Sequence, residues 1–255
     1  MKQELCPVRG VHEVAENTFV LQFSSEFISS NVRPGQFVNL RAESGIEPLL
    51  RRPFSVYRTV DDIVEVIFNV IGRGTSILRR KKKGDFLDVL GPLGVPFSLS
   101  SNDFTTAVLI GGGLGIAPLP ISASALARFG TPMITFLGAR TATQLVDSHL
   151  MNVHVATDDG SKGFHGTVVD LASEFISKKS IPSPKIFACG PTAMLRSVAT
   201  LARDAQIPCE VSLEGVMGCG FGICQGCPVE LVGGDKKYGL MCMDGPTFDA
   251  TRVKI

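Results

Sequence analysis

The chain has 255 residues, 44% hydrophobic and 19% charged, a composition typical of a globular protein with room for one large or two to three small domains. Its formal net charge of +1 gives no electrostatic basis for binding nucleic acid or an anionic membrane. No apolar run of about 18 residues could span a bilayer, and no apolar core follows the first residues as in a signal peptide, so we expect a cytoplasmic protein.

The first hundred residues favour short strands separated by turn signals. Pro34-Gly35, Gly72 and Gly84 interrupt four segments rich in Val, Phe, Leu and Ile, and these are the expected strands: Thr18–Phe23, Gln36–Arg41, Ile63–Val70 and Asp85–Leu90. Repeated short strands of this kind predict an antiparallel β-barrel or sandwich. One short helical segment, Thr75 to Lys82, is expected here.

Two stretches of this region could bind a phosphate group. Arg52 and Ser55 lie three residues apart beside a proline, and Thr75 is a good N-cap for the short helix. An arginine fork next to free N–H groups at a helix start would hold a pyrophosphate. The alternative for Arg52 is a surface ion pair. The basic run Arg79–Lys83 predicts a solvated face, with a docking patch for an acidic partner as the alternative.

After Asp103 the pattern changes to strands that alternate with helices. The expected strands are Ala107–Ile110, Pro132–Leu137, Val153–Ala156, Lys185–Ala188 and Pro208–Leu213. The expected helices are Ile116–Arg128, Gly166–Ser177 and Thr192–Ala205. This alternation predicts a parallel sheet with ligands at the carboxyl ends of its strands.

A glycine cluster, Gly111-Gly112-Gly113-Leu114-Gly115, follows the first of these strands. A dinucleotide phosphate would lie there, although the pattern departs from the strict G-x-G-x-x-G fingerprint. Leu137-Gly138-Ala139-Arg140 has no acidic residue to bind a ribose, so the sequence does not distinguish NAD from NADP.

The cysteines near the end of the chain have metal-ligand spacing. Cys219, Cys224 and Cys227 form a C-x4-C-x2-C pattern, and Cys242 follows at a distance, which is the plant-type arrangement for a [2Fe–2S] cluster. Interspersed glycines suit a loop curled around a cluster. Structural zinc usually takes paired C-x2-C knuckles, which this spacing fits poorly. Disulfides are also disfavoured, because nothing in the sequence marks the chain as secreted. The remaining cysteines are odd in number and scattered, as in a reducing compartment: Cys6, Cys189 and Cys209.

The motif Arg52-Pro53-Phe54-Ser55, with Gly74-Thr75 downstream, resembles the flavin-binding elements of the ferredoxin–NADP reductase superfamily. Residues 84–94 resemble the strand and turn that close the flavin barrel in that family. The resemblance implies that Arg52 meets the FAD pyrophosphate and Ser55 approaches the isoalloxazine. The implied FAD site consists of Arg52, Pro53, Phe54, Ser55, Asn69, Val70, Ile71, Gly74 and Thr75.

The glycine cluster resembles the pyridine-nucleotide domain of the same superfamily, and Cys189-Gly190-Pro191-Thr192-Ala193-Met194-Leu195 resembles its second landmark, which lies beside the nicotinamide. The implied NAD site consists of Gly111, Gly112, Gly113, Gly115, Pro118, Asp158, Cys189, Gly190 and Pro191. The alternative interpretation of Cys189 is a buried residue that only packs, since a free cysteine behaves as a small hydrophobic residue. No catalytic residue is assigned.

The order of modules narrows the resemblance to the electron-transfer subunits of class 1B dihydroorotate dehydrogenase, over essentially the whole chain. The expected domains are an FAD-binding β-barrel at 1–102, an α/β NAD-binding domain at 103–210 and a [2Fe–2S] domain at 211–255. The family implies electron transfer from an FMN-containing catalytic subunit through the cluster and FAD to NAD+ in pyrimidine biosynthesis, in a cytoplasmic heterotetramer with two of each subunit.

Two alternatives remain open: a flavin and iron–sulfur subunit of another complex, of the sulfhydrogenase or ferredoxin–NADP oxidoreductase type, and a redox-sensing regulator. A cluster segment of about forty-five residues cannot bury much of a core, which favours docking on another subunit. Val216, Met217 and Phe221 are the expected apolar contacts, with burial in the core as their alternative.

Overall fold

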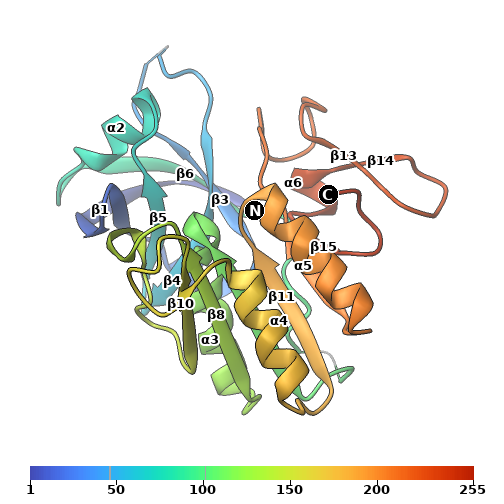
Figure 1. The fold of residues 1–255 in the computed structure, drawn as a ribbon. Helices are drawn as coiled ribbons and strands as arrows, with labels where there is room; N and C mark the ends of the chain where they lie inside the picture. Colours follow the sequence, from blue (N-terminus) through green and yellow to red (C-terminus); the bar gives the residue numbers. More distant parts are fainter. Residues whose placement is uncertain (46, 101) are drawn as a thin grey trace.

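Six antiparallel strands in the first part of the chain close into a barrel in the order β1-β2-β5-β4-β3-β6 (Figure 1). The structure is a computed structural model that describes residues 1–45, 47–100 and 102–255. The strands are β1 Lys2–Ala15, β2 Thr18–Ser24, β3 Phe37–Arg41, β4 Arg52–Val60, β5 Ile63–Asn69 and β6 Phe86–Leu93. Alternate side chains point inward, so Val38 and Leu40 of β3 lie in the barrel core.

Three elements of the barrel differ from the expectation. Strand β1 was not expected, because its polar residues, Pro7 and Gly10 hide the apolar alternation of a half-buried strand. Helix α1, Glu26–Asn31, was also missed. Helix α2 spans Arg73–Arg79, so Gly72 is its N-cap and the prediction that Thr75 caps it is wrong. The Thr75 hydroxyl accepts from the N–H of Gly72, at 3.2 Å.

The second body is a seven-stranded sheet in the order β10-β9-β8-β7-β11-β12-β15. Its strands are β7 Thr106–Gly112, β8 Met133–Ala139, β9 Val153–Thr157, β10 Phe164–His165, β11 Pro184–Cys189, β12 Cys209–Ser212 and β15 Thr247–Asp249. All pairs are parallel except β12 with β15, which confirms the predicted parallel sheet. The strands bury Val, Ile, Leu and Phe on both faces, as parallel sheets require.

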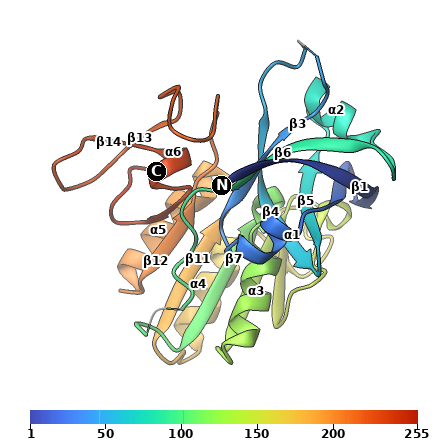
Figure 2. The same ribbon diagram turned by 180° about the vertical axis from the view of Figure 1, so that it is seen from behind.

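Helices cover both faces of this sheet. Helices α4, Val168–Lys178, and α5, Thr192–Asp204, lie on one face, and α3, Leu119–Arg128, lies on the other (Figures 1 and 2). The chain leaves β7 through a 3-10 turn, η1 Gly113–Ile116, so the expected helix from Ile116 begins three residues later.

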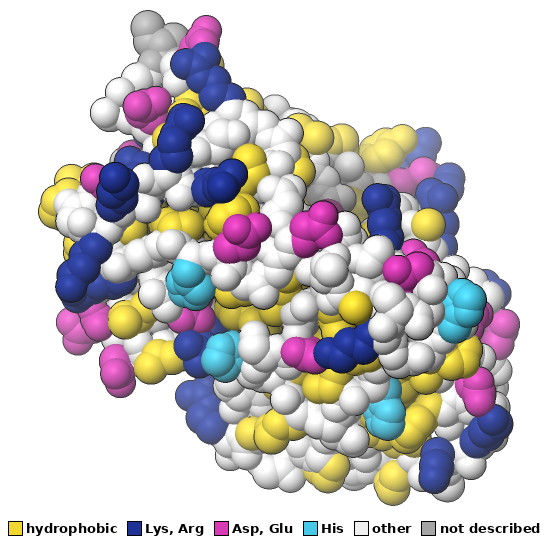
Figure 3. Space-filling model, turned by 60° about the vertical axis from the view of Figure 1, so that its left-hand side comes forward, with side chains coloured by type: hydrophobic (Ala, Val, Ile, Leu, Met, Phe, Trp, Pro, Cys, Tyr) yellow, Lys and Arg dark blue, Asp and Glu magenta, His cyan; other side chains and the backbone are white. Residues whose placement is uncertain are grey.

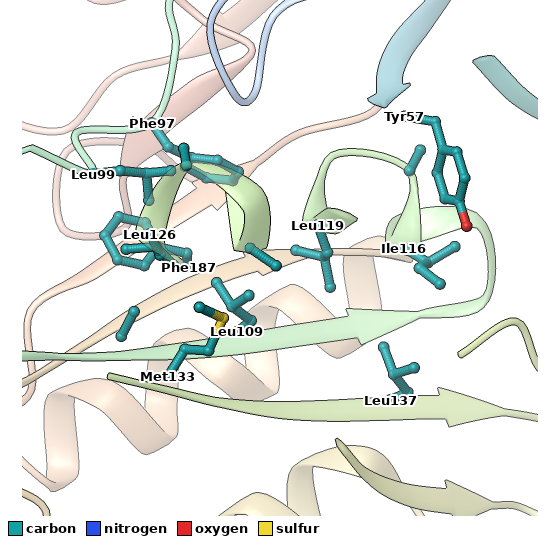
Figure 4. Packing of buried hydrophobic residues seen from close by; sticks show 14 of the residues in the cluster. Tyr57, Phe97, Leu99, Leu109, Ile116, Leu119, Leu126, Met133, Leu137 and Phe187 are labelled. Carbon is teal, nitrogen blue, oxygen red and sulfur yellow. The ribbon is translucent and has the colours of Figure 1, made fainter. Parts of the chain in front are cut away.

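Helix α3 packs between the sheet and β4 of the barrel, and the two bodies share one apolar core there. Tyr57 of the barrel belongs to the same cluster as Ile116, Leu119 and Leu137 (Figure 4). The hydroxyl of Tyr57 also lies 3.2 Å from the Ser148 hydroxyl on the connection after the short turn η2, Ala142–Gln144. This shared core fixes the barrel against the carboxyl ends of the strands.

The last forty residues form a small lobe beside the barrel and α5 (Figure 2). It contains β13 Pro228–Glu230, β14 Tyr238–Leu240 and α6 Met241–Asp244. Strand β15 then joins the edge of the large sheet, so the C-terminal segment is tied to that sheet. The expected boundary at residue 211 falls inside β12. No helix in the described part of the chain is long and apolar enough to cross a membrane.

Candidate functional site

The loop that carries Cys219 directs backbone N–H groups at its sulfur. The N–H groups of Phe221 and Cys224 each lie 3.5 Å from the Cys219 Sγ. Burial would raise the pKa of this thiol, but the N–H groups of Cys224 and Phe221 outweigh that effect and lower the pKa to about 6. A thiol held in this way is largely a thiolate at neutral pH, the form that binds iron.

The four predicted ligands fall into two pairs. Cys219 interacts with the thiol of Cys224, and the sulfurs of Cys227 and Cys242 lie 3.3 Å apart. Burial, followed by the neighbouring Cys227 thiol, raises the pKa of Cys242 to about 12, so a bound cation is needed to keep Cys242 as a thiolate. In the described residues no group of three or more His, Cys, Asp or Glu side chains surrounds a single metal position. Two pairs of cysteines fit the two irons of the predicted cluster.

Small residues leave room around these sulfurs. A β-carbon on Gly218 would lie 3.1 Å from Cys224 Sγ, and one on Gly226 would lie 3.4 Å from the same atom. The N–H of Gly226 also points at this sulfur, at 3.4 Å. The loop therefore gives the thiolates donors and space, which fits the predicted [2Fe–2S] cluster.

Arg52 and Gly74 come together at the barrel end of the molecule. A β-carbon on Gly74 would lie 2.6 Å from Arg52 Nε, so the guanidinium packs over the first turn of α2. Its neighbour Arg51 instead pairs with Asp88, at 2.6 Å. Arg52 has no carboxylate partner among the ion pairs of the described residues, and its guanidinium donates to the carbonyl of Leu50. Of the two arginines, Arg52 remains free to meet an anion.

The other predicted flavin residues lie around this point. Pro53 and Ser55 face outward on β4, paired with Asn39 and Phe37 of β3, whereas Phe54 packs into the barrel core. Asn69, at the end of β5, donates to Thr18 Oγ1 at 2.9 Å. Val70 packs on the barrel core, while Ile71 is 88% exposed. A large apolar side chain so exposed beside a cleft fits contact with a bound ring system.

A cleft of about 710 Å³ lies between the barrel and the carboxyl ends of the large sheet. The predicted residues that line it are Asn69, Ile71, Gly112, Gly113, Asp158 and Pro191. Both bodies contribute to it, so a flavin bound on the barrel can face a nucleotide bound on the sheet. Four residues of the basic run are exposed at the C-terminal end of α2 and just after it: Arg79, Arg80, Lys82 and Lys83. Figure 3 shows Lys and Arg side chains gathered on one side of the molecule.

The two predicted nucleotide motifs are in contact with each other. A β-carbon on Gly115 would overlap the backbone of Cys189 and Gly190, so the turn after β7 packs directly on the turn after β11. Cys189 is buried, and burial raises the pKa of its thiol, so it packs as a neutral group. Gly111 contacts Leu119 at the start of α3, for which Pro118 is the N-cap. These residues shape the cleft from behind its surface.

Several lining residues were not predicted as site residues. They come from strand ends, helix starts and loops that become neighbours only in the folded chain: Glu16, Asn17, Thr18, Leu114, Ile116, Gly138, Ala139, Arg140, Gln144, Val146, Thr167, Val168, Val169, Ala193, Met194 and Ser197. Met194 lies in the quoted motif and fills the space beside Gly112 and Gly190. Arg140 could have been found, because it follows the carboxyl end of the predicted strand Pro132–Leu137.

Comparison with protein families places the tail in a known group. A family model described as "Iron-sulfur cluster binding domain of dihydroorotate dehydrogenase B" matches residues 214–254. A protein of Desulforamulus reducens named "Dihydroorotate dehydrogenase B (NAD(+)), electron transfer subunit" is 35% identical over 96% of both chains. A protein of the same name from Bacillus caldolyticus is 37% identical over 98% of both chains.

Solved structures with a similar fold include two reductases. One described as "Insights into flavin-based electron bifurcation via the NADH-dependent reduced ferredoxin-NADP oxidoreductase structure" has a TM-score of 0.86 and 33% identity, and the match covers 98% of this chain and 90% of that chain. The Amycolatopsis cytochrome P450 reductase GcoB has a TM-score of 0.67 and 23% identity over 81% of this chain and 67% of its own, a likeness of fold alone.

Proposed function

Because the chain belongs to the family of dihydroorotate dehydrogenase B electron-transfer subunits, we propose that it carries electrons from a separate FMN-containing catalytic subunit to NAD+. The observation that supports this most strongly is that the paired cysteines, the Arg52 motif and the cleft lie on one folded unit. The chain is an oxidoreductase subunit, and its own residues hold the [2Fe–2S] cluster, FAD and NAD.

Each group has its own set of residues. Cys219 and Cys224 bind one iron of the cluster, and Cys227 with Cys242 binds the other. Arg52 and the turn at Gly74-Thr75 hold the FAD pyrophosphate. FAD, when bound, supplies the exchange between the two electrons of a hydride carrier and the single electrons of an iron–sulfur cluster.

The sheet side of the cleft binds the nucleotide. Gly112 ends β7 and Gly113 follows it, where a backbone without side chains lets a phosphate approach, and Asp158 lines the same cleft. The shared core around Tyr57 keeps this surface at a fixed position relative to the barrel. The chain itself therefore holds the nucleotide side of the cleft opposite its flavin side.

The partner docks beside the cluster. Among the predicted contacts, Val216 is 85% exposed, whereas Met217 and Phe221 pack against Phe37 and Leu93 of the barrel and belong to a core. Next to the ligands Cys224 and Cys242, Ile223 is 77% and Met243 54% exposed. Exposed apolar side chains around a one-electron centre fit a protein interface. The family resemblance supports a cytoplasmic heterotetramer with two copies of each subunit.

The test is a reconstitution. The isolated chain is expected to reduce artificial acceptors with NADH and to leave dihydroorotate unoxidised, whereas addition of the catalytic subunit restores NAD+-linked oxidation. Ile223→Glu is expected to weaken co-elution with that subunit while the NADH-to-acceptor activity stays. Phe129→Glu, at an apolar residue after α3 that is 57% exposed, is the control. Dihydroorotate oxidation by the isolated chain would contradict the proposal.

A second candidate function follows from the structural likeness to the NADH-dependent ferredoxin-NADP oxidoreductase. At 33% identity over nearly the whole chain, that protein is as similar as the dihydroorotate dehydrogenase relatives. The same cofactor set would then serve a different complex. The reconstitution separates the two, because only the first partner brings dihydroorotate oxidation.

A further inference from the structure

Strand β3 presents two residues to the cluster lobe. Val38 and Leu40 point into the barrel core, so Phe37 and Asn39 point outward by the alternation of a strand. Phe37 packs in one cluster with Met217, Met241 and the ligands Cys227 and Cys242. Asn39 is buried, with 1% of its surface exposed. The barrel and the cluster loop therefore meet along this strand.

Among the described residues the Asn39 amide makes one hydrogen bond, and its partner is a predicted cluster ligand. Its Nδ2 donates to the backbone carbonyl of Cys219, at 2.8 Å. Within the described residues its Oδ1 has no hydrogen-bond partner and is buried. A buried acceptor without a partner is costly, so the position would favour an apolar side chain if packing alone selected it.

The cluster loop is shaped to accept this side chain. Gly220 follows the ligand Cys219 and has φ +82°, and a β-carbon on it would overlap the Asn39 amide. Only glycine both adopts this backbone conformation readily and leaves room for the amide. The contact thus needs the Asn39 amide on the barrel side and a glycine at position 220 on the loop side.

Strand β4, which carries the flavin motif, pairs with β3 along one edge. Asn39 pairs with Pro53, and Phe37 pairs with Ser55, across the β3–β4 ladder. Directly paired residues share a face of the sheet, so Asn39 lies beside the outward face of the Arg52-Pro53-Phe54-Ser55 motif. One hydrogen bond and one strand pair then connect Cys219 with the flavin-binding strand.

We infer that Asn39 is a positioning residue that holds the Cys219 segment against the flavin-binding strand and so sets the distance between the cluster and flavin sites. The inference rests on the proposed function, since it assumes that electrons pass between these two sites. The rate of electron transfer falls steeply with distance. If the Cys219 loop is released from β3, electron transfer between the flavin and the cluster therefore slows even when both groups are bound.

The test separates this step from the steps on either side of it. Asn39→Leu keeps the shape of the side chain and removes both the donor and the unpaired acceptor. Asn31→Leu is the matched control, because the Asn31 amide also donates to a backbone carbonyl, that of Phe27 at 2.8 Å, far from the cluster on α1. Asn39→Asp is a second isosteric variant, which lacks the Nδ2 donor.

Stopped-flow absorbance of the FAD- and cluster-loaded chain follows flavin reduction by NADH and then cluster reduction. We expect flavin reduction at the wild-type rate and slower cluster reduction in both Asn39 variants. Hydrogen exchange in residues 217–224 should speed up by about two- to tenfold, the range that the loss of one neutral hydrogen bond gives. The EPR spectrum of the reduced cluster should keep its intensity and broaden.

An unchanged cluster reduction rate with unchanged hydrogen exchange would overturn the inference. So would loss of the cluster from both Asn39 variants, because the bond would then serve assembly rather than distance. If Asn39→Leu alone loses the cluster, Asn39→Asp decides the outcome. Wild-type chain that bound no FAD or cluster, or whose flavin NADH did not reduce, would instead contradict the proposed function.

Discussion

The sulfur atoms of Cys227 and Cys242 lie 3.3 Å apart, although the two residues are 15 positions apart in the chain. A disulfide would bring them to about 2.05 Å, so this is a contact between two thiols. Cys242 is the first-turn residue of α6, which packs behind the loop through Met241. The short helix therefore delivers the distant fourth ligand to a site that the loop begins.

This pairing predicts the effect of each cysteine change. Cys227→Ser or Cys242→Ser is expected to deplete iron and to abolish the EPR signal of the reduced cluster, because the iron assigned to this pair loses one of its two thiolates. Iron and sulfide analysis of anaerobically purified protein measures this. Cys209→Ser, at a buried cysteine on β12, is the control and should keep both. Stoichiometric zinc without iron in the wild type would contradict the assignment.

Arg52→Ala is expected to weaken FAD binding roughly ten- to a hundredfold, the effect of losing a charge-assisted hydrogen bond to a phosphate. Fluorescence titration of FAD into flavin-free protein gives the dissociation constant. Arg51→Ala is the adjacent control, since Arg51 already pairs with Asp88 and should leave the affinity within about twofold of wild type. Equal losses in both variants would place the phosphate elsewhere.

Gly74→Ala should separate flavin binding from stability. The added β-carbon would lie 2.6 Å from Arg52 Nε and displace the guanidinium, so FAD affinity falls several-fold. The free energy of unfolding of the flavin-free chain is expected to change by less than about 1 kcal/mol, because alanine favours the helix. In Gly72→Ala nothing lies within 4 Å of the new atom, and its extended backbone suits any residue, so affinity should persist.

The cluster ligands could be predicted from the sequence because their chemistry is local. Three of them lie within nine residues, and the spacing itself restricts the metal centre. Strand–helix alternation likewise predicted the parallel sheet, since the central strands β7 and β8 are mostly apolar. The Arg52 motif was informative only through its resemblance, because a single arginine on a strand has no distinguishing pattern.

The parts that were missed depend on contacts between distant segments. Strand β1 has a mixed pattern, yet it closes the barrel by pairing with both β2 and β6. Strand β15 is three residues long and forms only because β12 offers a sheet edge. Met217 and Phe221 looked like surface contacts because a short tail suggested little core, whereas Phe37 and Leu93 of the barrel supply that core.

The buried carboxylate of Glu65 predicts a pH dependence of stability. Burial would raise its pKa, but hydrogen bonds from Arg58 and Gln22 outweigh this and hold the pKa below the ordinary value of 4.5. A depressed pKa stabilises the fold above about pH 4.5, and the contribution is lost as pH falls through the folded pKa. Glu65→Gln should therefore lower the free energy of unfolding at pH 7.

Urea unfolding from pH 7 down to pH 4 measures that difference. We expect the gap between wild type and Glu65→Gln to be widest at pH 7 and to narrow as the solution is acidified, because protonation removes the charge in the wild type as well. A gap that stays constant with pH would show that Glu65 acts by packing alone.

The hydrogen bonds of Thr247 hold the C-terminal segment against the residues that follow the barrel. Its buried hydroxyl donates to the carbonyls of Val95 and Pro96, at 2.8 and 2.9 Å, while its backbone pairs with Ser212 in the sheet. One residue thus ties the segment that follows the barrel, the sheet edge and the end of the cluster lobe together. Thr247→Val keeps the shape and removes the donor.

The two carbonyls then lose their partner in a buried site, so the free energy of unfolding should fall by about 1–3 kcal/mol. Thr251→Val is the control, because the Thr251 hydroxyl bonds the exposed Asp249 carboxylate, at 2.7 Å, and its loss should cost less than about 0.5 kcal/mol. Urea unfolding of both variants gives the comparison. Since β15 directly follows the segment with Cys242, Thr247→Val should also release iron faster to a chelator than Thr251→Val does. Equal stabilities and equal release rates in the two variants would show that the lobe is held by β15 pairing without the Thr247 hydroxyl.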